Sequence, residues 1–245
     1  MRGKNGLIRY NSGMAVETFQ GTQKDSLGKR LRTKAKIAFS GKYDAINPID
    51  YESTVRGEYQ RAERAQALAA FMTHYVDVPP QGEPPSILDI AAGTGIISRS
   101  LKEKGYHVTA TDLSQRALEF LHTKDPSIQT QQADMNKRLP FADNAFEGAT
   151  TFWGNRYIKD SEAFLREVYR VLKPGGVFVW PIFPLEGPIW KTRSGIMNPT
   201  TSRRLKKTAL EAGFTDAEIV RKPLGELRNG PSDRERGLRI IVLKK

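Results

Sequence analysis

The sequence predicts an α/β domain built on a doubly wound sheet of seven strands, mostly parallel with an antiparallel last strand. One observation behind this is an apolar strand at 86–90 that breaks into a Gly-Thr-Gly turn and then opens an apolar helix. A second is the alternation of strand and helix patterns beyond it, which implies parallel strands joined by crossover helices. A third is Asp112 at the tip of the second strand, where α/β nucleotide sites hold ribose hydroxyls.

The expected elements follow along the chain. Apolar residues recurring at steps of three and four predict a helix over about 53–75, and the proline-rich residues 78–85 form a stiff linker after it. Strands are expected near 86–90, 107–111, 128–132, 146–152 and 176–182, and helices near 95–104, 114–122, 160–172 and 201–213. Two apolar runs, 216–221 and 238–243, are expected to form the antiparallel hairpin that closes the sheet.

These elements divide the chain into three expected parts. Residues 1–42 are basic and glycine-rich without sustained periodicity, and we expect them to be mobile. Residues 43–82 form a helical cap or lid at the N-terminal side, and residues 83–245 form the domain that carries the sheet.

The net charge of +12 is concentrated at the two ends of the chain. Residues 1–42 carry a balance of +8 and residues 201–245 one of +6, which leaves the centre slightly acidic. Such basic ends favour an anionic partner, namely RNA, an acidic lipid surface or a phosphorylated substrate. A solvated tail without a partner is the alternative interpretation.

The chain has no cysteine, which excludes disulfides and thiolate metal sites and fits a reducing compartment. No apolar run reaches the roughly 18 to 20 residues of a membrane span, and no secretory leader is recognisable. No His, Asp or Glu spacing suggests a metal site. We therefore expect a cytoplasmic protein without a metal.

A Gly-x-Gly turn after a strand is found in the binding sites of two classes of cofactor, of which the dinucleotides are the first. Dinucleotide dehydrogenases usually have a further glycine where this chain has Ser98. The run Leu-Pro-Phe-Ala-Asp-Asn-Ala-Phe-Glu at 139–147 and the run Glu-Val-Tyr-Arg-Val-Leu-Lys-Pro-Gly-Gly at 167–176 instead resemble class I S-adenosylmethionine-dependent methyltransferases of the ubiquinone/menaquinone-biosynthesis-like (type 11) family. The resemblance covers residues 84–182 in register and implies a Rossmann-like fold with S-adenosylmethionine as cofactor.

The resemblance also implies which residues hold the methionine end of the cofactor. The backbone of Gly93, Thr94 and Gly95 would pass beneath it, and Asp89 would orient this loop or the ammonium group, unless it only caps the turn. Ala91 stands where the family often has a glycine, a departure that costs little room. Tyr43 would close over the methionine end as part of the lid or, equally, be a packed aromatic.

The nucleoside end is expected on the neighbouring strand ends. The Asp112 carboxylate matches a vicinal diol and would accept both ribose hydroxyls, and Leu113 would lie against the adenine. By resemblance, Asp134 would accept from the adenine amino group while Met135 packs on the ring; a surface acid beside a core methionine is the alternative. Two further residues would border the cofactor at the end of the fourth strand: Thr151 and Phe152.

The methyl acceptor is much less determined, because alignment of nucleophile, methyl and sulfur can supply much of the acceleration. No catalytic side chain is assigned: the Leu-His-His run of many small-molecule relatives is replaced here by residues 153–157. Trp153 and Tyr157 could sandwich a planar acceptor, and Arg156 could hold an acidic one, with Asn155 beside them. Alternatively, the aromatic residues are core and the arginine is on the surface.

Direct in-line methyl transfer to a small molecule is the function that these residues favour. An RNA methyltransferase that uses the basic termini is the alternative, although the Asn/Asp-Pro-Pro-Tyr segment and the cysteine nucleophile of two RNA-modifying routes are absent. A cofactor-binding assembly protein without catalysis is the third possibility. The sequence does not predict an oligomeric state.

Overall fold

The computed structural model describes residues 58–152, 154–182, 202–222 and 238–245. The expected basic segment 1–42, the lid residue Tyr43 and the acceptor residue Trp153 lie outside these ranges.

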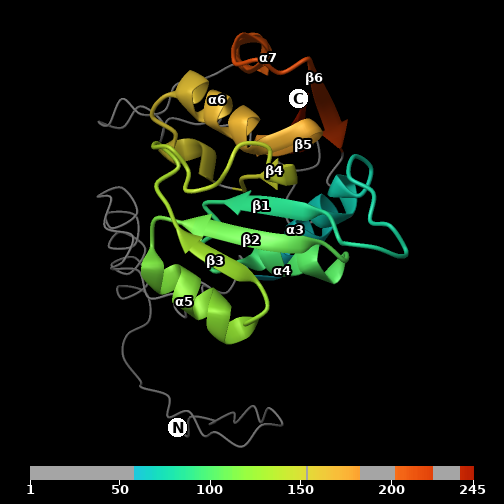
Figure 1. The fold of residues 1–245 in the computed structure, drawn as a ribbon, viewed down its shortest axis with the longest axis vertical. Helices are drawn as coiled ribbons and strands as arrows, with labels where there is room; N and C mark the ends of the chain where they lie inside the picture. Colours follow the sequence, from blue (N-terminus) through green and yellow to red (C-terminus); the bar gives the residue numbers. More distant parts are fainter. Residues whose placement is uncertain (1–57, 153, 183–201, 223–237) are drawn as a thin grey trace, which may run out of the picture. The chain divides into compact units, whose positions relative to one another are not determined.

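A seven-stranded sheet in the order β3-β2-β1-β4-β5-β7-β6 forms the centre of the described structure. Its strands are β1 (Ser86–Ile90), β2 (His107–Asp112), β3 (Gln129–Gln132), β4 (Phe146–Thr150), β5 (Leu172–Ile182), β6 (Asp216–Lys222) and β7 (Leu238–Lys244). Strands β1 to β5 pair in parallel, whereas β7 is antiparallel to both of its neighbours. The predicted fold class and the closing hairpin are therefore confirmed. In Figure 1 the arrowheads of β1, β2 and β3 point to the same side, which is the edge where their carboxyl ends meet.

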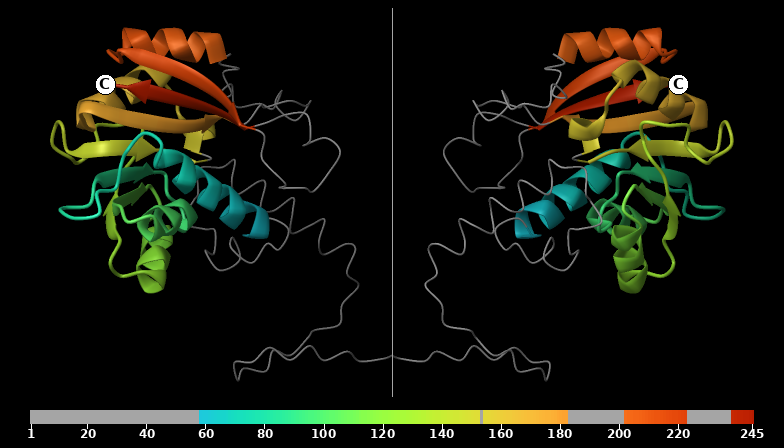
Figure 2. Two further views of the ribbon diagram at one scale, coloured as in Figure 1. Left: turned by 90° about the vertical axis from the view of Figure 1, so that its right-hand side faces the viewer. Right: turned by 90° about the vertical axis from the view of Figure 1, so that its left-hand side faces the viewer.

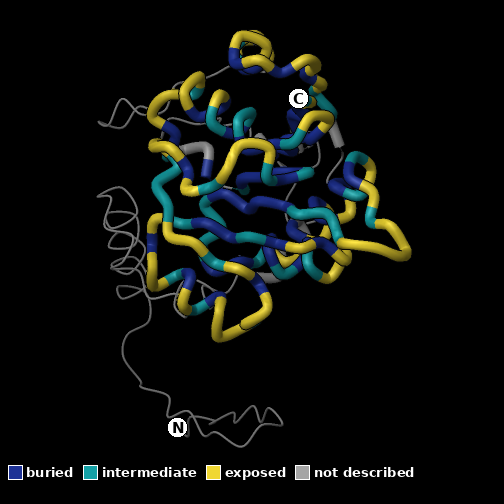
Figure 3. The backbone as a smooth tube through the Cα atoms, in the orientation of Figure 1, coloured by how far each residue is buried: buried dark blue, intermediate teal, exposed yellow. Residues whose placement is uncertain are grey.

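Helices cover both faces of this sheet. They are α3 (Glu58–Met72), α4 (Ile96–Glu103), α5 (Gln115–Lys124), α6 (Ser161–Val171) and α7 (Ser202–Glu211). One apolar core joins α3, α4 and α5 to one face, and a second joins α6 and α7 to the other. Figures 1 and 2 show α5 and α7 at opposite ends of the sheet, and Figure 3 shows the buried residues concentrated in its central strands.

Helix α3, the expected cap helix, packs into the same core as the sheet. Leu68 and Met72 are buried among residues of α4 and of the central strands. The segment after the helix is held as well, because the Tyr106 hydroxyl donates to the carbonyl of Val76 over 2.6 Å. This part of α3 is thus a structural support of the sheet, while the domain boundary at residue 82 stays a prediction.

Two strands differ from their expected bounds by more than one residue. Strand β4 ends at Thr150 rather than 152, because the chain turns into a short 3-10 helix, η2 (Gly154–Tyr157). Strand β5 begins at Leu172 rather than 176, and its register with β4 shifts where the run Lys-Pro-Gly-Gly at 173–176 bulges from the pair. Because proline and glycine are typical of turns, this run predicts a turn where the strand has already begun.

The two sequence runs that carry the family resemblance are joined by Arg170 on α6. Its guanidinium donates to the carbonyls of Leu139 (3.1 Å) and Phe141 (2.8 Å) and pairs with Glu167 and Asp143. These acids raise the pKa of Arg170 further above its already high value, and the side chain is 14% exposed. The runs therefore brace the loop before β4 against α6. Among the helices described, none has the length and apolar character to cross a membrane.

Candidate cofactor site

The carboxyl ends of β1, β2, β3 and β4 meet at the point where the strand order reverses around β1. In doubly wound sheets, ligands bind in the crevice that forms at this position. The predicted site residues that the structure describes lie at the carboxyl ends of these strands or in the segments that follow them.

The loop after β1 is a tight turn through the left-handed region of backbone conformation. Gly93 and Gly95 have φ values of +57° and +77°. A Cβ at Gly93 would meet no atom within 4 Å, so the backbone faces open space there, whereas a Cβ at Gly95 would collide with the buried Leu121 of α5. The two glycines thus have different roles: Gly93 leaves the loop accessible, and Gly95 lets α5 pack against it. Thr94 between them is buried.

Ala91 also has a left-handed backbone, with φ of +58°. The sequence interpretation weighed only the room that an alanine takes, and that was the wrong criterion. The cost of Ala91 is conformational, because a non-glycine residue in this region is disfavoured by roughly 1–2 kcal/mol.

Asp89 lies at the end of β1 and is only 1% exposed. Its Oδ2 accepts a hydrogen bond of 2.6 Å from the Ser98 hydroxyl on α4, while its Oδ1 has no partner among the described residues. Burial raises the pKa of Asp89 to about 7; the Ser98 hydrogen bond opposes this rise and the nearby charge of Asp112 adds to it. A buried acceptor without a partner requires explanation in a folded protein, and a cationic or donating ligand group at this loop would supply one.

Asp112 is held in place by backbone groups from two loops. Its Oδ2 accepts from the Gly93 amide over 2.8 Å and its Oδ1 from the Ser114 amide over 2.9 Å. Each carboxylate oxygen accepts more than one hydrogen bond, so both can also receive hydroxyl donors. The half-buried side chain therefore connects the glycine turn to the loop after β2. Leu113 beside it is 47% exposed, an unusual surface position for a leucine that an overlying adenine would cover.

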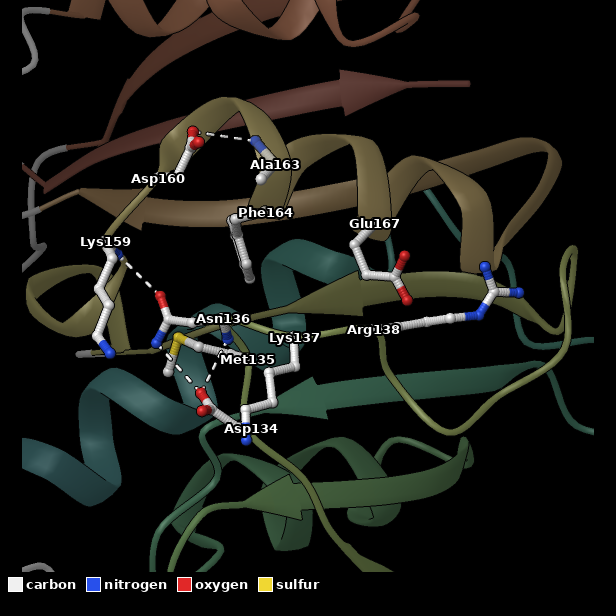
Figure 4. Close-up of a pocket in the computed structure, with 10 residues that line it drawn as sticks. All are labelled: Asp134, Met135, Asn136, Lys137, Arg138, Lys159, Asp160, Ala163, Phe164 and Glu167. Atoms are coloured by element: carbon white, nitrogen blue, oxygen red, sulfur yellow. Dashed lines mark hydrogen bonds between the residues drawn. The ribbon is translucent and has the colours of Figure 1, made fainter.

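Asp134 and Met135, on the loop after β3, line a cavity of about 360 Å³ that extends to α6 (Figure 4). From α6, Ala163 and Phe164 contribute apolar surface to its opposite wall. Asp134 caps its own loop by accepting from the Asn136 amide over 3.0 Å. The predicted adenine residues thus line a concave surface at the carboxyl edge of the sheet.

The loop after β4 forms the other border of the site. Thr151 is fully buried, its hydroxyl has no partner among the described residues, and Phe152 is half-buried. A Cβ at Gly154 would collide with the Thr151 hydroxyl and would also lie 3.1 Å from the Ala91 side chain, so the loops after β1 and β4 pack closely here. Tyr157 is half-buried, and the structure does not describe the side chains of Asn155 and Arg156.

Sequence reasoning missed two residues of this edge. Ser98 was considered only as a missing glycine, yet its hydroxyl donates to the Asp89 carboxylate. An acid at a strand end, followed nine residues later by a serine in the next helix, is the sequence signal that could have indicated this bond. Asn136 was not singled out, although it bonds to the loops after both β3 and β4.

The chain is similar to known methyltransferases in both sequence and fold. Residues 88–180 match a family model described as a methyltransferase domain. The described fold is similar to that of solved S-adenosylmethionine-dependent methyltransferases. One such enzyme, from Mesorhizobium loti, superimposes with a TM-score of 0.57 at 18% identity, over 75% of this chain and 100% of that one. A Haloferax volcanii complex of a methyltransferase activator and a putative methyltransferase gives 0.60 at 18% identity, over 76% and 96%.

Among characterised proteins, this chain is similar in sequence to methyltransferases named for quinone biosynthesis. A ubiquinone/menaquinone biosynthesis C-methyltransferase of Desulfotalea psychrophila is 38% identical over 144 residues, which are 57% of this chain and 52% of that protein. A demethylmenaquinone methyltransferase of Corynebacterium glutamicum is 38% identical over 140 residues, 55% of this chain and 59% of that protein. The chain thus spans slightly more than half the length of these relatives.

The residues at this edge fit S-adenosylmethionine. The open face of Gly93 leaves room for the amino-acid moiety, the two Asp112 oxygens suit the ribose diol, and the exposed Leu113 offers an apolar surface to adenine. The unpartnered Asp89 Oδ1 adds an acceptor on the same loop.

Proposed function

We propose that this chain is an S-adenosylmethionine-dependent methyltransferase whose cofactor lies across the loops after β1, β2 and β3. The observation that carries the proposal is Asp112, whose two oxygens are fixed by the Gly93 and Ser114 amides beside an open glycine turn. Fixing the carboxylate before the ligand arrives lowers the ordering cost of binding. Asp134 and Met135 would receive the adenine, and Thr151 and Phe152 would border the cofactor from β4.

Bound S-adenosylmethionine supplies a methyl group on an electrophilic sulfonium. The protein's task is then to align an acceptor with that methyl group, and a base is needed only where the acceptor must lose a proton. The loops therefore matter chiefly through the geometry that they impose, which agrees with the lack of an assigned catalytic side chain.

Calorimetry with S-adenosylhomocysteine tests the cofactor site. Asp112→Ala removes two charge-assisted hydrogen bonds, each worth roughly 1.5–3 kcal/mol, so we expect affinity to fall at least a hundredfold. Asp112→Asn keeps the size of the side chain and should also weaken binding, which separates loss of the carboxylate from loss of the loop. Asp143→Ala, an exposed carboxylate in the loop before β4, serves as the control and should bind normally. Unchanged affinity in both Asp112 variants would refute the proposal.

We propose further that the acceptor is a small molecule with a quinone-type ring, methylated at carbon. The support is the likeness to relatives named as ubiquinone/menaquinone C-methyltransferase and demethylmenaquinone methyltransferase. The aromatic residues of the segment 153–157 would suit a planar ring. Action in the cytoplasm also stays a prediction, and the RNA alternative depends on the charge of the termini alone.

Transfer of a labelled methyl group distinguishes these acceptors. The purified protein is incubated with methyl-labelled S-adenosylmethionine and either a reduced demethylated naphthoquinone, a reduced benzoquinone precursor or total RNA. We expect label in a quinone product and none in RNA, with Asp112→Asn as the inactive control. Label in RNA alone would replace the small-molecule proposal by the RNA alternative.

A further inference from the structure

Asn136 joins two loops that come from different strand ends. Its side-chain Nδ2 donates to Asp134 Oδ1 (3.2 Å), in the loop after β3, and to the carbonyl of Tyr157 (3.1 Å), in η2 after β4. Its Oδ1 accepts from the backbone amide of Lys159 over 2.8 Å. Figure 4 shows Asn136 between Asp134 and Lys159 at the cavity wall.

The pattern of partners requires an asparagine at this position. A backbone amide only donates and a backbone carbonyl only accepts, so Lys159 and Tyr157 together determine which end of the side-chain amide faces each of them. An aspartate would keep the acceptor for Lys159 but would lose both donors and place a second carboxylate against Asp134. An alanine would remove all three side-chain bonds.

The bonds of Asn136 do not result from burial. The residue is exposed, so its side chain could be solvated instead, and yet all of its bonds are directed to the two loops. One of these loops carries Asp134, which the proposed function assigns to the adenine. The other contains the segment that it assigns to the acceptor.

We infer that Asn136 is a positioning residue that couples cofactor binding to the order of the acceptor segment. The inference rests on the proposed function, because it requires a ligand at Asp134. A ligand that contacts Asp134 restricts the loop after β3, and Asn136 transmits that restriction to residues 157–159. By linkage, an ordered acceptor segment favours cofactor binding by the same factor. The cofactor would thus prepare the acceptor side of the site before the acceptor arrives.

The Lys159 amide reports this coupling directly, because it donates to Asn136 Oδ1. Amide hydrogen exchange is measured by NMR with and without S-adenosylhomocysteine in the full chain, in Asn136→Ala, in Asn136→Asp and in Lys137→Ala. Lys137 is an exposed neighbour on the same cavity wall whose side chain makes no hydrogen bond to another described residue, so Lys137→Ala is the matched control. Calorimetry on the same samples gives the ligand affinity.

We expect the ligand to slow exchange of the Lys159 amide about tenfold in the wild type and in Lys137→Ala, a typical coupling factor. In Asn136→Ala the exchange should be faster and independent of the ligand. Asn136→Asp keeps the acceptor for Lys159 but loses both donors, so its exchange should also be independent of the ligand. The factor by which these variants lose ligand affinity should not exceed the factor by which the ligand slows exchange of the Lys159 amide in the wild type. A purely structural role would raise the exchange rate but would leave the ligand effect in place.

Three results would overturn the inference, and they differ in what else they refute. Binding without protection of Lys159 in the wild type, or ligand-dependent protection that persists in Asn136→Ala, refutes the coupling and leaves the proposed function intact. Absence of any binding by the wild type refutes the proposed function and the coupling with it.

Discussion

Replacing Asp89 by asparagine should change how the stability of the ligand-free protein depends on pH. The folded protein holds this carboxyl buried with a pKa of about 7, whereas the ordinary pKa of an aspartate is 3.8. Between these two values the unfolded chain releases the proton and the folded chain keeps it. Stability contributed by the protonated Asp89 is therefore complete below about pH 4 and is lost as pH rises through 7.

The magnitude follows from the difference between the two pKa values. A difference of about 3 units at about 1.4 kcal/mol each corresponds to a penalty of about 4 kcal/mol at pH 8. From pH 5 to pH 8 the wild type should lose about 3 kcal/mol through this group. The asparagine is neutral throughout, so Asp89→Asn should not show this loss.

Urea denaturation at pH 5 and pH 8, followed by circular dichroism, measures the effect. The free energy of unfolding of Asp89→Asn relative to the wild type should rise by about 3 kcal/mol between the two pH values. Asp143→Asn is the control: the Arg170 hydrogen bond holds the pKa of Asp143 below its ordinary value, so it stays ionised over this range. The same pH dependence in Asp89→Asn and the wild type would refute the argument that Asp89 is a buried acid of raised pKa.

Three further predictions concern the glycine turn and the N-terminal segment. Gly93→Val should weaken S-adenosylhomocysteine binding at least tenfold by calorimetry, while the circular dichroism spectrum keeps its native form, because the new side chain enters open space at the ligand face. Gly95→Ala should destabilise the fold by about 2–4 kcal/mol through its collision with Leu121. Gly82 also has a positive φ, but a Cβ there would meet no atom within 4 Å. The control variant Gly82→Ala should therefore lower the free energy of unfolding by only about 1 kcal/mol. Deleting residues 1–36 should leave cofactor affinity within twofold if the enzyme acts on a small molecule; a steep, tail-dependent salt slope for RNA binding would instead support the RNA alternative.

Patterns that depend on neighbouring residues predicted most of the fold. Apolar runs bounded by turns located the buried central strands, because burial on both faces of a parallel sheet leaves a local signature. The early start of β5 was missed, since the run Lys-Pro-Gly-Gly at 173–176 suggests a turn while the structure keeps it as a bulge within the strand.

The site was predictable where one strand end determines it and unpredictable where distant segments meet. The sequence predicted Asp112 at the tip of β2, and its two amide donors are in reach because the loops after β1 and β2 are adjacent. The strained backbone of Ala91 and the bridging bonds of Asn136 depend on tertiary contacts, the latter across 21 to 23 residues. No local pattern encodes such contacts.

A crystal structure with S-adenosylhomocysteine would test the central claim most directly. The account predicts the ribose hydroxyls on the two oxygens of Asp112, the amino-acid moiety over Gly93, and the adenine between Leu113 and the loop of Asp134 and Met135. A ligand that binds elsewhere, or whose ribose makes no contact with Asp112, would contradict it.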